Sequence, residues 1–170
     1  MRLLVIPGSK NGGTAEIGRA IAQELRSHGL DVDVSQPDHI HNLAPYAGFV
    51  IGSAIYMGEW LPASTEFVAQ NVGVISERPT WLFSSGPVGE AQPREPMQRG
   101  VVARLIEMTG ALGHRMFGGR LDLERLSRSD AFVARWVGAE DGDDRDWDEI
   151  STWSSAIADH LLSLGPANIE

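Results

Sequence analysis

The stretch Leu3–Thr14, LLVIPGSKNGGT, decides the fold of this chain. Four apolar residues, Leu3–Ile6, lead into a loop of small residues, and a helix with regular apolar spacing follows at once. An apolar run without alternation is typical of a buried parallel strand. A strand followed by free backbone amides at a helix N-terminus binds phosphate in α/β proteins, and glycines let the phosphate come close. We therefore expect a phosphate-bearing cofactor on residues 9–14. The alternative is a tight turn that only connects a strand to a helix.

Predicted strands and helices alternate along the rest of the chain. Strands are expected at 30–34, 47–53, 79–85 and 114–121, and helices at 14–28, 61–68, 101–112, 129–137 and 147–164. This alternation predicts an α/β fold with a parallel sheet wound on both faces. Right-handed crossovers place every strand-to-helix loop at one edge of such a sheet, where ligands bind. Three loops rich in small residues, 8–14, 52–58 and 84–89, are expected to meet there.

Composition limits the class of protein. The chain has 170 residues, 42% hydrophobic and 22% charged, and no repeat or linker divides it, so residues 1–170 are predicted to form a single domain. A net charge of −9 argues against nucleic acid and anionic lipid as partners. The absence of cysteine fits a cytoplasmic protein, and no apolar run is long enough for a membrane span. A small molecule or another protein is the expected partner.

Familiar phosphate-loop patterns can be tested on the first loop. Gly8–Gly13 gives the G-x-x-x-x-G frame of a nucleoside triphosphate loop, but Thr14 stands where that loop needs lysine. The dinucleotide pattern G-x-G-x-x-G is absent. Response-regulator chemistry needs acidic residues where Pro7 and Ser53 stand. What remains is a monophosphate loop lined by hydroxyls and amides.

The segment Ser9–Thr14 resembles the phosphate loop of flavodoxins, Ser/Thr-x-Thr-Gly-x-Thr. Ser9, Gly12 and Thr14 match this pattern, and Asn11 replaces a threonine. The segments GSAIYMG and FSSGPVG, at 52–58 and 83–89, are similar to the second and third cofactor loops of a flavodoxin-domain family that includes the menaquinone-dependent protoporphyrinogen dehydrogenases. HRMFGGRL and GDDRDW, at 114–121 and 142–147, are also similar to that family, so the resemblance spans almost the whole chain.

This resemblance implies a three-layer α/β/α sandwich whose five-stranded parallel sheet has the order 2-1-3-4-5, with FMN at its carboxyl edge. The FMN phosphate would lie on Ser9, Lys10, Asn11, Gly12, Gly13 and Thr14. The flavin ring would lie between the two other loops, which contribute Ser53, Ala54, Ile55, Tyr56, Met57, Gly58, Trp60, Ser85, Gly86, Pro87, Val88 and Gly89. Tyr56 is the preferred aromatic to stack on the ring, whereas Trp60 can equally be a core residue.

The function implied by the resemblance is an FMN-dependent oxidoreductase of protoporphyrinogen dehydrogenase type. It would oxidise a small-molecule substrate and pass electrons to a quinone or a redox protein. No aromatic residue occurs between Phe83 and Phe117, so one ring face is left open for a substrate or quinone. Two alternatives stay open: an electron carrier without its own substrate, and a cofactor-free binding module, which Pro7 and Asn11 suggest.

Other polar residues have competing interpretations. Lys10 can contact phosphate or be a solvated lysine, and Thr14 can also be the helix N-cap. His39 and His41 have no evident third partner, so no metal site is predicted. The acidic run 140–149 is expected to be a solvated loop with a capping box at Asp146, or a docking surface for a cationic redox partner. His114 is expected at the sheet edge away from the site, in a structural role.

Overall fold

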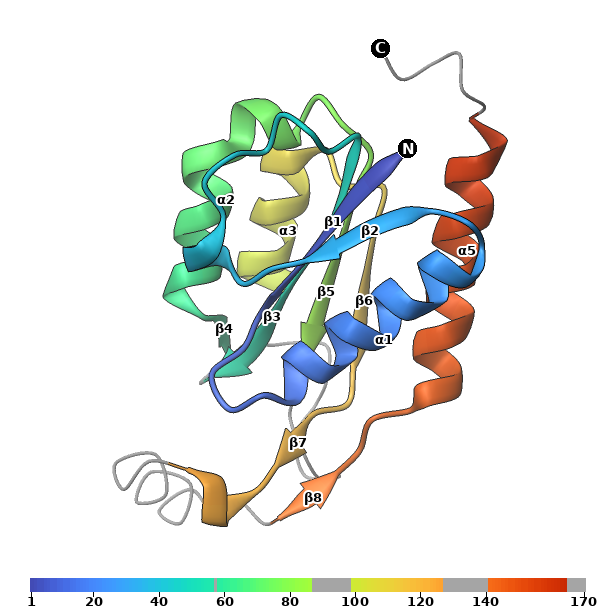
Figure 1. Ribbon diagram of the computed structural model, residues 1–170. Helices are drawn as coiled ribbons and strands as arrows, with labels where there is room; N and C mark the ends of the chain where they lie inside the picture. The colour runs from blue at the N-terminus through green and yellow to red at the C-terminus, as the bar shows by residue number, and fades with distance from the viewer. Residues whose placement is uncertain (57, 87–98, 127–140, 165–170) are drawn as a thin grey trace.

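The computed structural model describes residues 1–56, 58–86, 99–126 and 141–164 (Figure 1). Its strands are β1 (Arg2–Gly8), β2 (Asp31–Val34), β3 (Gly48–Tyr56), β4 (Glu59–Trp60), β5 (Thr80–Ser85), β6 (Gly113–Phe117), β7 (Arg120–Leu121) and β8 (Gly142–Asp143). Its α-helices are α1 (Gly13–Ser27), α2 (Pro62–Ile75), α3 (Arg99–Thr109) and α5 (Trp147–Ser163), with 3₁₀ turns at Pro37–His39 and Leu123–Arg125. The helix predicted at 129–137 lies outside the described residues. Within them, no helix has the length and apolar character to span a bilayer.

The main sheet has the strand order β2-β1-β3-β5-β6, and neighbouring strands along this path are parallel. This is the order 2-1-3-4-5 that the resemblance implied, so that prediction is confirmed. The short strand β4 is added to β3 as an antiparallel hairpin in which Ile55 pairs with Trp60. Strand β1 lies between β2 and β3, and the end of β1 therefore lies near the middle of the carboxyl edge.

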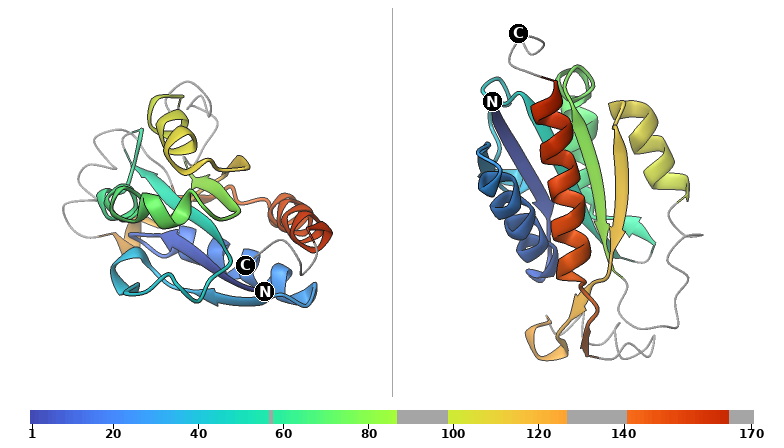
Figure 2. Two further views of the ribbon diagram at one scale, coloured as in Figure 1. Left: turned by 90° about the horizontal axis from the view of Figure 1, so that it is seen from above. Right: turned by 90° about the vertical axis from the view of Figure 1, so that its right-hand side faces the viewer.

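Helices cover both faces of the sheet, and β1 is buried between them. Leu3 and Val5 pack in a core cluster with α1 and α5, whereas Leu4 and Ile6 pack in a second cluster with α2 and α3. Figures 1 and 2 show the resulting three layers, with α1 and α5 on one side of the sheet and α2 and α3 on the other. The uninterrupted apolar run of β1 follows from burial on both faces.

The strand predicted at 114–121 is shorter than expected. β6 ends at Phe117, and Arg120–Leu121 leaves the sheet to form β7, which pairs antiparallel with β8. Close packing at Gly118 accompanies this break, because a Cβ there would lie 1.9 Å from the carbonyl oxygen of Asp144. The β7–β8 ribbon extends beyond the carboxyl edge of the sheet, beneath the start of α1 (Figure 1).

Pro7 does not interrupt β1. The strand continues to Gly8, and Pro7 and Gly8 pair with Gly52 and Ser53 of β3. Ser35 N donates to Val5 O, so backbone groups at odd positions of β1 face β2, which ends at Val34. The missing amide of Pro7 therefore faces a side where the ladder has already stopped, and it removes no bond from the β1–β3 ladder.

Candidate functional site

Three loops lie side by side at the carboxyl edge of the sheet. Gly8, at the end of β1, pairs with Ser53 of β3, and Ala54 of β3 pairs with Ser85 of β5. The starts of the three loops are thus fixed within neighbouring strands. This arrangement brings the predicted phosphate segment 9–14 next to the predicted ring segments.

The N-terminus of α1 has unused backbone donors. Its first intrahelical bond runs from Glu16 N to Gly12 O, so the amides of residues 13–15 have no partner within the helix. The capping position is held by Gly12, with φ of 88° and no side-chain cap, so the alternative role of Thr14 as the N-cap is wrong. Donors of this kind, together with the helix dipole, favour an anion.

The loop before α1 leaves room for a ligand. Gly12 N donates to Ser9 Oγ at 3.0 Å, and the Ser9 hydroxyl proton stays available for another acceptor. No heavy atom lies within 4 Å of the position that a Cβ of Gly12 would occupy. The main chain at Gly12 is therefore open to close approach, as a phosphate loop requires.

The second loop offers a single exposed aromatic ring. Tyr56 is 39% exposed, and Lys10 Nζ lies 5.0 Å from the centre of its ring. Trp60 is only 3% exposed and packs with the α2–α3 core cluster, which matches its interpretation as a core residue. Ile55 and Ala54 are half-buried beside Tyr56, and Met57 lies outside the described residues.

Ser53 is fully buried and shapes this loop from inside. Its Oγ accepts from Leu61 N and donates to Ala54 O, both at 2.9 Å. These two bonds connect the end of β3 to the residue before α2. The Ser53 hydroxyl thus already donates one hydrogen bond and accepts another within the protein, so a ligand would contact Ser53 through its backbone.

The third loop approaches the second one closely. Gly86 N donates to Phe117 O at 3.1 Å, and Gly86 adopts φ of 112°. A Cβ there would lie 3.7 Å from Ile55 O, so backbone of the two ring loops comes together at this point. Ser85 is buried, and Pro87, Val88 and Gly89 lie outside the described residues.

A buried polar chain crosses the sheet behind the second loop. Trp60 Nε1 donates to Ser84 Oγ at 2.8 Å, and Ser84 Oγ lies 2.9 Å from His114 Nε2. Burial lowers the pKa of His114 to about 4, so its imidazole is neutral at pH 7. Since Ser84 already accepts from Trp60, we assign its hydroxyl as the donor to Nε2, which places the imidazole proton on Nδ1.

His114 makes the stability of the fold depend on pH. Its pKa falls from 6.5 to about 4 on folding, so only the unfolded chain gains a proton there as pH drops from about 6.5 to about 4. We expect this group to remove about 2 kcal/mol of unfolding free energy across that window, after allowance for partial exposure. This contribution is measured by urea unfolding of the wild-type protein and of His114→Gln at several pH values. The unfolding free energy of the variant should lack the decrease between about pH 6.5 and about pH 4 that His114 causes. Parallel curves for the two proteins would contradict the assignment.

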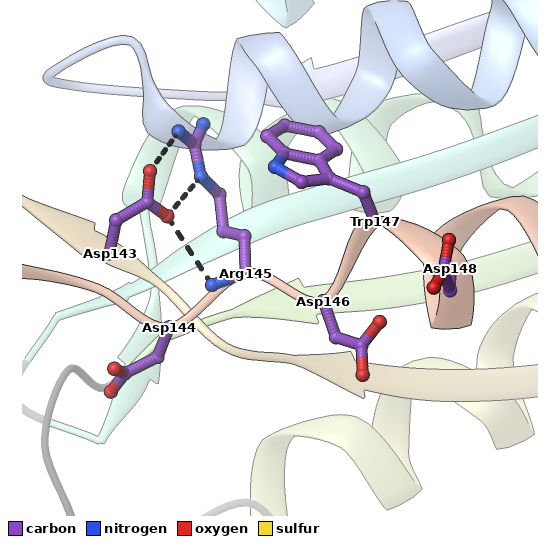
Figure 3. A pocket seen from close by; sticks show the side chains of 6 residues that line it. All are labelled: Asp143, Asp144, Arg145, Asp146, Trp147 and Asp148. Atoms are coloured by element: carbon purple, nitrogen blue, oxygen red, sulfur yellow. Dashed lines mark hydrogen bonds and ion pairs between the residues drawn. The ribbon is translucent and has the colours of Figure 1, made fainter.

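Sequence analysis missed an ion cluster beside the predicted phosphate helix. Arg145, whose side chain is 4% exposed, lies 2.6 Å from Glu16 Oε2 and 2.6 Å from Asp143 Oδ2. It also donates to Gly13 O at 3.4 Å. Figure 3 shows its guanidinium beside Asp143, with the ring of Trp147 alongside. Arg120 of β7 adds contacts to Glu16 and to Asp122.

The charges of this cluster stabilise one another. The hydrogen bond from Arg145 lowers the pKa of Glu16 and that of Asp143 below their usual values. The same bond to Asp143 raises the pKa of Arg145. The cluster therefore stays ionised at neutral pH and holds the β7–β8 ribbon against the first turn of α1.

The acidic run is thus more than a solvated loop. Asp146 Oδ1 accepts from Glu149 N at 2.9 Å, as its predicted capping role requires. An open hollow is lined by residues 143–148 (Figure 3). The one signal in the sequence was Arg145 itself, a single cation within the run Glu140–Glu149.

The fold and the glycine-rich carboxyl edge define a flavodoxin-like α/β protein. Residues 4–148 match the flavodoxin domain family, and the chain belongs to that family, whose members typically bind FMN. Protoporphyrinogen IX dehydrogenase [quinone] of Escherichia coli K12 is 24% identical over 95% of this chain and 96% of its own length.

Solved structures agree with this fold. A flavodoxin from the domain Archaea superposes with a TM-score of 0.65 at 18% identity, over 95% of this chain and 99% of the flavodoxin. Oxidised flavodoxin 1 from Bacillus cereus gives a TM-score of 0.65 at 15% identity, with the same coverage. At these identities the likeness supports the fold alone.

Proposed function

We propose that this protein binds FMN at the carboxyl edge and acts as an oxidoreductase of protoporphyrinogen dehydrogenase type. The observation that carries the proposal is the pairing of an uncapped α1 N-terminus with an exposed Tyr56 across the same edge. One feature suits a phosphate, and the other suits a flat aromatic ring.

The residues present fit FMN. Amides 13–15 and the hydroxyls of Ser9 and Thr14 would hold the phosphate, while Asn11 offers a side-chain amide. Tyr56 would stack on the flavin, and the close backbone of Ile55 and Gly86 would border its edge. When bound, FMN accepts and donates electrons, and the chain contributes binding, orientation and electrostatics.

The relative of similar length supports a quinone as the acceptor in this proposal. That protein is named for a quinone, and the two chains match over nearly their whole lengths. We infer that a quinone or a redox protein reoxidises the flavin here. The second candidate is a carrier without its own substrate, which the same FMN site would also serve.

FMN binding is the first prediction to test. Purified protein titrated with FMN should give a shifted flavin spectrum, and Tyr56→Leu should weaken binding by about tenfold through lost stacking. Tyr46→Phe is the matched control, because Tyr46 bonds to Asp33 beside β2, away from the site. Protein that carries no flavin after FMN is added and the unbound FMN is removed would exclude both flavin functions.

Turnover separates the enzyme from the carrier. The FMN-loaded protein should oxidise protoporphyrinogen when a menaquinone analogue is present. A loaded protein that is rapidly reduced by a reductase, yet oxidises no protoporphyrinogen, would establish the carrier instead.

A further inference from the structure

We propose that Lys10 sets the redox balance of the bound flavin by placing a positive charge beside the ring that stacks on Tyr56. This inference rests on the proposed FMN site and goes beyond it, because it assigns the tuning of that site to one side chain. Lys10 is also the single lysine in the sequence, among fourteen lysine and arginine residues in all.

The contact between Lys10 and Tyr56 joins two of the loops at the carboxyl edge. Lys10 comes from the loop before α1, and its Nζ lies 5.0 Å from the ring centre of Tyr56 at the end of β3. An ammonium above an aromatic face is attracted by the negative face of the ring. The side chain thus leans from the phosphate segment toward the ring segment.

Two arginines near this edge belong to the ion cluster at the start of α1. Arg145 is paired with Glu16 and Asp143, and Arg120 is paired with Glu16 and Asp122. Glu59 stands opposite Tyr56 in the β3–β4 pair. Among the described residues of the three loops, Lys10 is the cation that lies over the Tyr56 ring.

The effect does not depend on which face of Tyr56 the flavin covers. A ring stacked on Tyr56 lies about 4 Å from it, so a flavin on the far face is within about 9 Å of Lys10 Nζ. A flavin on the near face displaces the ammonium sideways and keeps it closer. At such distances, in a site partly shielded from water, the Lys10 ammonium interacts strongly enough with a charged flavin ring to shift its redox equilibrium.

Reduction changes the charge of the flavin ring. Two electrons and one proton convert the neutral oxidised ring into a monoanion, and the electrons come from the reductant used. A nearby cation stabilises the anion but has little effect on the neutral ring. Lys10 should therefore raise the affinity for reduced FMN relative to oxidised FMN, and with it the reduction potential.

The test compares Lys10→Gln with Lys10→Arg, which retains the charge. For each protein, dissociation constants of oxidised and reduced FMN and the midpoint potential are measured at low and high salt. Lys10→Gln should lower the reduced-to-oxidised affinity ratio about tenfold, which is ~30 mV for a two-electron couple. Lys10→Arg should stay close to wild type, and salt should shrink the difference.

Two results would overturn the proposal while FMN binding stands. The first is a midpoint potential of bound FMN that is the same in Lys10→Gln as in the wild-type protein. Equal weakening of both redox forms is the other, since it would make Lys10 only a phosphate contact. Wild-type protein that binds neither form of FMN would overturn the proposed function together with this inference.

The contact itself can be tested without flavin. Reductive methylation with ¹³C-formaldehyde labels Lys10 and the N-terminal amine alone, because the chain has no other lysine. The Lys10 methyl signal should show a ring-current shift that disappears in Tyr56→Leu and persists in Tyr46→Phe. A signal that is identical in wild type and Tyr56→Leu would contradict the geometry.

Discussion

Replacing Gly52 by alanine should destabilise the protein by about 3 kcal/mol, near the upper end of what overpacking a core costs. A Cβ at Gly52 would lie 2.2 Å from two ring carbons of Phe83. The ring cannot withdraw, because Phe83 is fully buried and packs against Phe117 and Trp153. Urea unfolding of the variant measures the loss.

Two companion variants identify the cause. Gly73→Ala is the matched control, because a Cβ there meets nothing within 4 Å, and alanine in the last turn of α2 should add about 0.5 kcal/mol. Gly52→Ala combined with Phe83→Leu should be less destabilised than the sum of the single changes, since the clash is removed. Strict additivity would show that the ring is not the obstacle.

The prediction also bears on the site. Gly52 pairs with Pro7 and Phe83, directly before the residues where β1 and β5 lead into their loops. A displaced Phe83 would move Ser84 and Ser85 relative to β3. Loss of FMN binding should therefore accompany loss of stability.

The sequence predicts the sheet well because its strongest signals are local. The apolar run Leu3–Ile6 and the glycines after it specify a buried strand and a phosphate-type loop without reference to the rest of the chain. The order of the strands came from family resemblance, since periodicity alone does not tell which strands are neighbours. The buried strand and the strand order are confirmed in the main sheet, and the phosphate role of the loop stays a prediction.

The site is predicted at the level of loops but not of individual side chains. The sequence grouped Ser53 and Tyr56 of segment 52–58 with Trp60, two residues after it. Only Tyr56 presents an exposed ring, while Ser53 and Trp60 are buried and bonded internally. Burial depends on residues far away in sequence, such as Ser84, which bonds to Trp60 across 24 positions. No local pattern carries that information.

The ion cluster was missed for the same reason. Arg145 reaches Glu16 across 129 positions, and Arg120 reaches it across 104. In the sequence, Arg145 is one basic residue in an acidic run, which is typical of a solvated segment. Only the antiparallel pairing of β7 with β8 brings that run to the start of α1.

Replacing Arg145 by methionine should cost about 2 kcal/mol of unfolding free energy at pH 7, between the values for exposed and for buried ion pairs, because the Arg145 side chain is buried whereas Glu16 and Asp143 are partly exposed. The change keeps the stem but leaves Asp143 without Arg145 and Glu16 with Arg120 alone. It also removes a donor from Gly13 O in the first turn of α1. Affinity for FMN should fall with stability, because the amides 13–15 belong to that turn.

The pH dependence and a remote pair test this account of Arg145. Its hydrogen bonds lower the pKa values of Glu16 and Asp143 in the folded protein, so their contribution is present at neutral pH and is lost as pH falls through those lowered values. The deficit of Arg145→Met should therefore shrink in acid. Arg2→Met, which breaks exposed pairs with Asp31 and Asp33 at the other end of β1, should cost at most about 0.5 kcal/mol. If Arg145→Met cost no more than Arg2→Met, the cluster would be an ordinary surface network, and the β7–β8 ribbon would need another reason to stay on α1.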